Sequence, residues 1–195
     1  MKVAIVFESL YGNTRPIAEA IGSGFDERDE VRIESVAGVD PATLRADLLI
    51  VGGGTDLNGR AIPTTRRAMD DAARQVPTLV LGPTACGAPL QEWLNTLPPA
   101  RSRAAAFDTR LDAPVLLLMS HASAAIAGRM KRRGYNLIAD PQSFLIDHES
   151  TLIDVEVERA HRWGQALSAE MHAADLDTLN AVADRATVSA GQMTR

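Results

Sequence analysis

Short apolar runs alternate with segments of helical periodicity along the chain. Apolar runs with β-branched residues predict buried strands near 2–7, 31–36, 47–52 and 103–107, and a fifth strand, interrupted or bent at Pro141, within 135–147. Apolar residues at helical spacing predict helices at 13–25, 63–75, 90–97, 120–133 and 155–171. This alternation indicates βαβ crossovers, and therefore an α/β fold with a doubly wound, five-stranded parallel sheet covered by helices on both faces.

This architecture limits where a ligand can bind. Doubly wound sheets bind ligands outside the carboxyl ends of their strands, where the winding reverses. The candidate loops are therefore 8–15, 52–62 and 108–120.

Two segments depart from the alternating pattern. Residues 76–82 have the composition of a strand, but Pro77 and Pro83 bracket them, and no proper helix separates them from the strand at 103–107. We interpret 77–82 as a connecting excursion outside the sheet; the alternative is a sixth strand. Residues 172–195 have weak helical periodicity and no strong core positions, so we expect one domain over 1–171 and a C-terminal surface tail.

Composition narrows the class of protein. The formal net charge of −5 argues against non-specific nucleic-acid binding, which depends on Lys and Arg. No stretch approaches the ~20 apolar residues of a membrane-spanning helix, and the apolar N-terminal run is too short for a signal peptide. The single Cys86 excludes an internal disulfide, and the four His have no metal-ligand spacing. We expect a cytoplasmic protein with no nucleic-acid, membrane or metal partner.

The first of the three loops carries the clearest chemistry. Gly12 can adopt the positive φ that a sharp turn requires, and the helix that follows opens with N–H groups that have no internal partner. The Ser9 and Thr14 hydroxyls and the Asn13 amide add donors without charge, and the loop has no Lys. These features favour a phosphate monoester held by neutral donors. The alternative is an ordinary turn with a helix N-cap.

Three stretches resemble the flavodoxin family. The sequence Val-Phe-Glu-Ser-Leu-Tyr-Gly-Asn-Thr at 6–14 is similar to the flavodoxin phosphate loop. Ala-Ala-Ala-Phe-Asp-Thr-Arg at 104–110 resembles a fourth-strand signature in a group of flavodoxin-domain proteins, as does the ending at 156–167. The resemblance covers most of residues 2–170, and it implies a flavodoxin-like sheet that binds flavin mononucleotide (FMN) non-covalently.

The resemblance also assigns residues to the cofactor. By analogy the FMN phosphate is held by Ser9, Leu10, Tyr11, Gly12, Asn13 and Thr14. One side of the isoalloxazine ring is flanked by Thr55, Asp56, Leu57, Asn58 and Gly59. The third ligand loop begins with Asp108, Thr109 and Arg110. No side chain needs to be catalytic, because the flavin supplies the chemistry.

The second loop departs from the family pattern and leaves two functions open. Gly54 stands where the family has Pro, and neither 52–62 nor 108–120 contains an aromatic residue that could stack on the ring. The first reading is an FMN-binding electron-transfer protein or oxidoreductase, with a redox partner protein or a small-molecule acceptor. The alternative is a flavodoxin-fold protein that has lost flavin, or binds it weakly, and acts as a binding or regulatory module. A quinone or nitro-compound reductase shares the fold, but no residue selects it, and the oligomeric state stays open.

Overall fold

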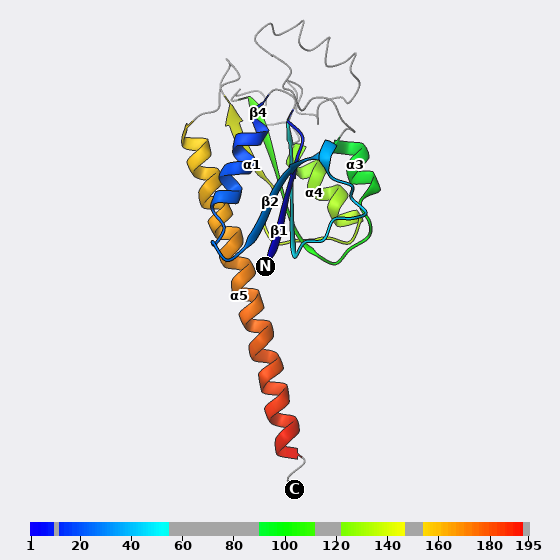
Figure 1. Ribbon diagram of the computed structural model, residues 1–195, viewed down its shortest axis with the longest axis vertical. Helices are drawn as coiled ribbons and strands as arrows, with labels where there is room; N and C mark the ends of the chain where they lie inside the picture. Colours follow the sequence, from blue (N-terminus) through cyan, green and yellow to red (C-terminus); the bar gives the residue numbers. More distant parts are fainter. Residues whose placement is uncertain (10–11, 55–89, 112–121, 147–153, 193–195) are drawn as a thin grey trace, which may run out of the picture.

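The computed structural model describes residues 1–9, 12–54, 90–111, 122–146 and 154–192, with the backbone alone at Leu111 and 177–192 (Figure 1). The strands are β1 (Lys2–Phe7), β2 (Glu30–Ser35), β3 (Leu48–Gly54), β4 (Arg103–Leu111), β5 (Asn136–Leu137) and β6 (Gln142–Ile146). The helices are α1 (Thr14–Ser23), α3 (Leu90–Thr96), α4 (Ala122–Arg132) and α5 (Asp154–Gln192), with a short 3-10 helix, η1, at Val36–Gly38. The strands near 2–7, 31–36 and 47–52 are confirmed, with shifts of at most two residues at their ends, and the strand expected at 103–107 is confirmed but continues to Leu111.

All strand pairs in the sheet are parallel, and the order is β2-β1-β3-β4-β5. The strand β6 also pairs with β4, beyond the two residues of β5, so β5 and β6 together fill the fifth position. The predicted interruption around Pro141 is therefore confirmed, because Pro141 lies between the two pieces. This is the order expected for a flavodoxin-like sheet.

Helices cover both faces of the sheet. Figure 1 shows α1 and α5 on one face and α3 and α4 on the other. Alternate residues of β1 follow this division: Ile5 belongs to the core under α1 and α5, while Val6 belongs to the core under α3 and α4. Both side chains are almost fully buried, which explains why the strands consist of continuous apolar runs instead of an alternating pattern.

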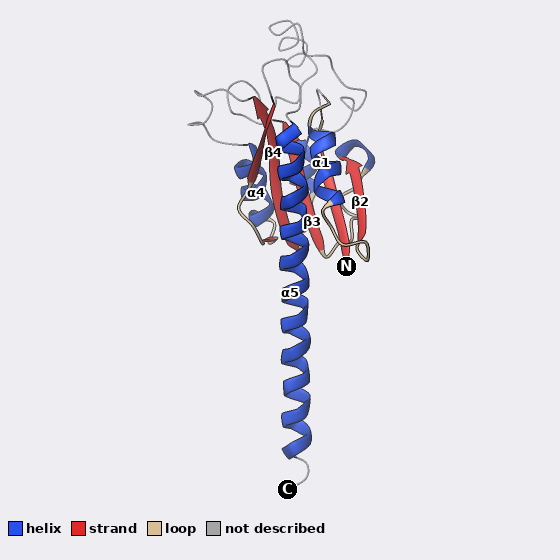
Figure 2. Cartoon of the chain, turned by 90° about the vertical axis from the view of Figure 1, so that its left-hand side faces the viewer, coloured by secondary structure: helices blue, strands red, loops and turns tan. Residues whose placement is uncertain are grey.

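Helix α5 is longer than the sequence pattern indicates. The expected end at residue 171 is wrong, because the helix continues to Gln192. Figures 1 and 2 show its C-terminal half projecting beyond the sheet. Helical periodicity reports contact with a core, and Met171, at 2% exposure, is the last core residue among the α5 side chains that the structure describes. The following residues are rich in Ala and contain no Pro, which is sufficient for helix without an apolar stripe.

Several expectations lie outside the described residues. They concern the helix at 63–75, the segment 77–82 and its proposed position outside the sheet, and the stretch 112–121.

Close packing joins α1 to α5. A Cβ on Gly164 of α5 would collide with the backbone oxygen of Ile21 and would lie 3.3 Å from the Cα of Gly24, just after α1. The two helix backbones meet at this point with no side chain between them. The lack of a side chain at Gly164 therefore sets how closely α5 packs against α1.

We expect Gly164→Ala to destabilise the protein by about 1–3 kcal/mol, because the added methyl group must push two backbones apart. An ordinary Gly→Ala change inside a helix has the opposite sign and stabilises by up to ~1 kcal/mol. Gly128→Ala in α4 is the matched control, because its Cβ would meet only the flexible end of Arg132, at 3.7 Å. Urea unfolding of both variants measures the difference; equal shifts in the free energy of unfolding would contradict the contact.

Candidate phosphate-binding site

The first loop connects β1 to α1 at the carboxyl edge of the sheet. Gly12 has φ +89°, so the predicted positive φ at this position is confirmed. No described heavy atom lies within 4 Å of where its Cβ would be, so a glycine is required here by backbone conformation and not by crowding. Side chains other than glycine are strained at this φ.

Asn13 stands at the N-cap position of α1 but does not cap the helix. Its backbone is helical, with φ −77° and ψ −31°, and its side chain makes no capping hydrogen bond. The side-chain Nδ2 is buried and has no hydrogen-bond partner among the described residues. A buried amide without a partner is uncommon, and here it adds a donor beside the first N–H groups of the helix. This arrangement suits an anion better than the plain N-cap alternative does.

Thr14 links the loop to a distant strand. Its hydroxyl oxygen lies 2.9 Å from the hydroxyl oxygen of Thr109 in β4, and either group can donate the hydrogen. Both residues are buried, at 3% and 4% exposure, and Ser9 is also buried, at 1%. The bond spans the position of β3, which lies between β1 and β4 in the sheet. The hydrogen bond therefore connects the first turn of α1 to β4 at the carboxyl edge of the sheet.

The residues expected to begin the third ligand loop lie inside β4. Asp108, Thr109 and Arg110 pair with Ser143, Phe144 and Leu145 of β6. Asp108 is fully buried, and its Oδ2 accepts a 2.8 Å hydrogen bond from the backbone N–H of Ser123 near the start of α4. Its Oδ1 is buried with no hydrogen-bond partner among the described residues. Asp108 therefore anchors α4, while Thr109, on the opposite face, reaches Thr14.

Glu8 is a functional candidate that the sequence reasoning did not single out. Its backbone N–H donates to Gly52 O at 3.0 Å, and its Oε1 accepts from the backbone N–H of Leu90 at 3.1 Å. Burial raises the pKa of the Glu8 carboxyl, and the hydrogen bond from Leu90 only partly opposes this shift. A charged residue directly after a buried strand was the available signal in the sequence.

Two glycines at the end of β3 are explained by packing. A Cβ on Gly52 would collide with the ring of Phe107, and a Cβ on Gly53 would lie 2.7 Å from Cδ2 of Leu90. The Phe107 ring therefore excludes a side chain at Gly52, whereas a side chain at Gly53 would have to displace the end of Leu90.

Part of the expected site lies outside the described residues: Leu10 and Tyr11 of the first loop, and Thr55, Asp56, Leu57, Asn58 and Gly59 of the second. Within the described part of the chain, no cluster of three or more His, Cys, Asp or Glu could hold a metal ion. No described helix is long and apolar enough to cross a membrane.

We expect Thr109→Val to lower the free energy of unfolding by about 1–2 kcal/mol, because the valine keeps the shape but leaves the buried Thr14 hydroxyl without this partner. Thr109→Ser is the control, since it keeps the hydroxyl. Urea unfolding checks both variants. A valine variant as stable as the serine variant would show that the hydrogen bond contributes nothing.

We expect Glu8→Gln to gain stability relative to the native protein as the pH rises above about 4.5. Because the pKa of Glu8 is raised, the folded protein keeps a proton that the unfolded chain releases. The stability of the native protein therefore falls as the pH rises from the ordinary pKa of Glu to the raised pKa of the folded state. The Gln side chain has no such proton, and its carbonyl oxygen can still accept from Leu90. Urea unfolding at about pH 4 and about pH 7 measures the change, with exposed Glu92→Gln as control. A difference in the free energy of unfolding between Glu8→Gln and the native protein that does not change with pH would contradict this expectation.

No family model matches the chain, and no curated protein matches it. Solved structures do. A flavodoxin from the domain Archaea has a TM-score of 0.60 and 21% identity, covering 88% of this chain and 99% of that chain. Flavodoxin 2 from Bacillus cereus has a TM-score of 0.61 and 20% identity, covering 87% and 99%. The Flv1 flavodiiron core from Synechocystis has a TM-score of 0.58 and 17% identity, covering 89% of this chain and 36% of that chain.

These matches agree with the strand order of the sheet. They share the architecture at low sequence identity, and therefore speak to the fold alone. The chain has a flavodoxin-like fold.

Proposed function

We propose that the protein binds FMN non-covalently at the first loop and acts as an electron-transfer protein or flavin-dependent oxidoreductase. The observation that carries the proposal is the turn at Gly12–Asn13–Thr14. It combines a positive φ, an uncapped helix N-terminus and a buried amide without a partner. Such an arrangement of neutral donors suits the phosphate group of FMN.

The proposed roles of the residues follow from their surroundings. Gly12 lets the chain turn around the phosphate, and the first N–H groups of α1 donate to it, with the Asn13 amide and the Thr14 hydroxyl beside them. Thr109 orients the Thr14 hydroxyl through their hydrogen bond. Leu10 and Tyr11 complete the loop, and Thr55 to Gly59 flank the ring in the proposal. When bound, the flavin supplies the transfer of electrons, so the protein contributes binding and orientation.

The proposal extends to partner and compartment. Flavodoxins among the structural neighbours suggest a redox partner protein or a small-molecule acceptor. The single Cys86 fits a reducing compartment, and we place the protein in the cytoplasm.

The second candidate is a module that has lost flavin. It is favoured by the absence of any aromatic residue from 52–62 and 108–120. Each ring-stacking contact adds ~1 kcal/mol beyond area burial, so a site without two such contacts is weaker by about tenfold to a hundredfold. A protein that purifies colourless and takes up no FMN would fit this candidate.

We expect Gly12→Val to abolish FMN binding, because valine is strained at φ +89° and its side chain enters the space assigned to the phosphate. Thr14→Ala should weaken binding by ~1 kcal/mol or more, through loss of a hydrogen bond to a charged group. Titration of flavin fluorescence measures both. The matched control is Gly38→Val, because Gly38 also has open space around it but no positive φ.

Riboflavin lacks the phosphate and should bind the native protein far less tightly than FMN. Circular dichroism and thermal unfolding show whether each variant remains folded. Equal affinities for riboflavin and FMN, or a folded Gly12→Val variant that binds FMN like the native protein, would overturn the loop assignment.

A further inference from the structure

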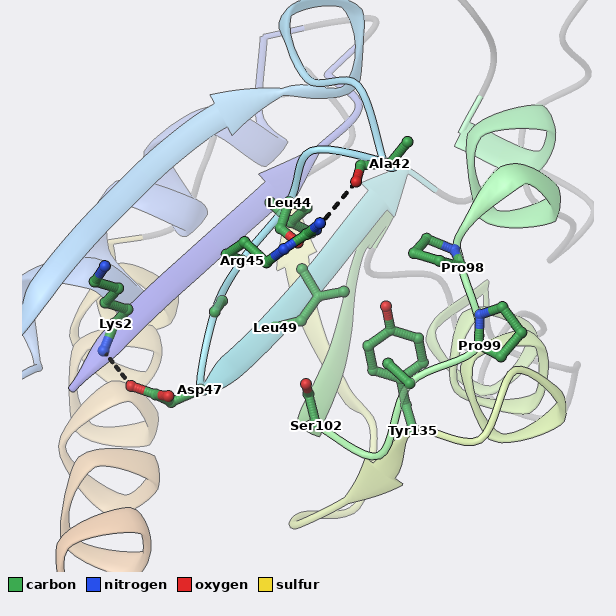
Figure 3. A pocket seen from close by; sticks show the side chains of 12 residues that line it. Lys2, Ala42, Leu44, Arg45, Asp47, Leu49, Pro98, Pro99, Ser102 and Tyr135 are labelled. Carbon is green, nitrogen blue, oxygen red and sulfur yellow. Dashed lines mark hydrogen bonds between the residues drawn. The ribbon is translucent and has the colours of Figure 1, made fainter.

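A second cavity lies at the opposite end of the sheet from the first loop (Figure 3). It has a volume of about 480 Å³ and is lined by residues at the amino ends of the strands, including Lys2, Leu49 and Ser102. Volumes of about 300–1,000 Å³ are usual for small-molecule sites. Ligands of doubly wound sheets bind at the carboxyl ends, so the proposed FMN site does not account for this cavity.

Apolar side chains form two walls of the cavity, and hydrogen bonds hold the segments that carry them. Figure 3 shows Pro98 and Pro99 on one side and Leu44 and Leu49 on the other. The proline wall is anchored because Ala100, the next residue, donates its N–H to Arg133 O at 3.1 Å. The opposite wall is held to β1, since the N–H of Asp47 donates to Lys2 O at 2.9 Å. Facing apolar walls of this kind suit a flat apolar body.

The Tyr135 hydroxyl is one of the polar groups that line the cavity, with Lys2, Arg45, Asp47 and Ser102. The residue is buried, at 8% exposure, and Figure 3 shows its hydroxyl turned toward the space between Leu49 and Pro98. Burial raises the pKa of the Tyr135 hydroxyl, which is a protonated donor at neutral pH even at its ordinary pKa. No hydrogen bond of this hydroxyl occurs among the described residues, and its oxygen is not one of the buried atoms that lack a partner, so the hydroxyl is accessible from the cavity.

Arg45 brings positive charge to the rim. Its Nη1 donates to Ala42 O at 3.0 Å and to Leu44 O at 2.7 Å, which holds the side chain in place. Both bonds use the same nitrogen, so Nε and Nη2 carry further donors for a ligand. The nearby carboxylate of Asp47 accepts from the backbone N–H of Lys2 at 2.7 Å. The guanidinium fork is suited to a carboxylate.

We propose that this cavity binds a small aromatic carboxylic acid. Its ring lies between the prolines and the leucines, its carboxylate meets Arg45, and an oxygen on the ring accepts the hydrogen bond of Tyr135. The site is independent of FMN binding, so the two proposals stand or fall separately.

The test is an NMR titration of the full chain with 4-methoxybenzoate, with the neutral 4-methoxybenzamide as matched probe. We expect saturable shifts of the amides around Leu44, Ala46 and Ser102, and weaker binding of the benzamide. Tyr135→Phe and Arg45→Gln should each weaken binding of the acid about fivefold or more, because each removes hydrogen bonds to the ligand. Arg162→Gln, an exposed change on α5 across the sheet, should have no effect.

Tyr135→Phe removes only a hydroxyl that has no described partner, so the variant should fold; thermal unfolding confirms this. The proposal is overturned if no saturable shift occurs up to about 10 mM acid, a concentration beyond the millimolar range of weak binding. It is also overturned if the shifts lie elsewhere, or if neither variant changes them. The FMN titration should be unchanged in both variants, which separates this result from that of the first loop.

Discussion

At the centre of the sheet, β3 pairs with β1 on one side and β4 on the other, and both pairings are parallel. Because parallel strands run the same way, their carboxyl ends emerge at one edge, and this brings together groups that are distant in sequence. The Thr14–Thr109 hydrogen bond joins residues 95 positions apart. It can form only because the loop after β1 and the end of β4 lie on either side of β3. The candidate site therefore depends on the pairing of β3 with β1 and β4.

The same edge carries groups that do not serve stability well. Asn13 Nδ2 and Asp108 Oδ1 are buried without hydrogen-bond partners among the described residues, and Glu8 is a partly buried carboxyl whose pKa is raised. Each costs free energy that an apolar or exposed residue would not. By contrast, Gly164 allows the backbones of α1 and α5 to pack closely, which stabilises the fold. Unfavourable polar groups gathered at one edge are typical of a site kept for binding.

The sequence predicts the strands and most described helices well, because apolar runs and helical spacing report burial directly. It fails where polar residues find partners far away in the chain. Asp108 to Arg110 look like the start of a loop, yet Asp108 meets the N–H of Ser123 and Thr109 meets Thr14, so β4 continues through them. The end of α5 was misplaced for a different reason: a helix needs no apolar stripe once it leaves the core. The role of Glu8 depends on Leu90, 82 residues away, and no local pattern contains it.

The glycines at the end of β3 bear on how a flavin would be held. In the sequence, the run Gly52-Gly53-Gly54 suggests a backbone that approaches a flat ring closely. The structure accounts for Gly52 by the ring of Phe107, and a side chain at Gly53 would have to displace the end of Leu90, so packing favours glycine at both positions. With no aromatic residue in 52–62 or 108–120, little in the sequence is left to favour the ring. In the proposed FMN complex, the phosphate turn at Gly12 must then supply a larger share of the affinity than in a site with stacked aromatics.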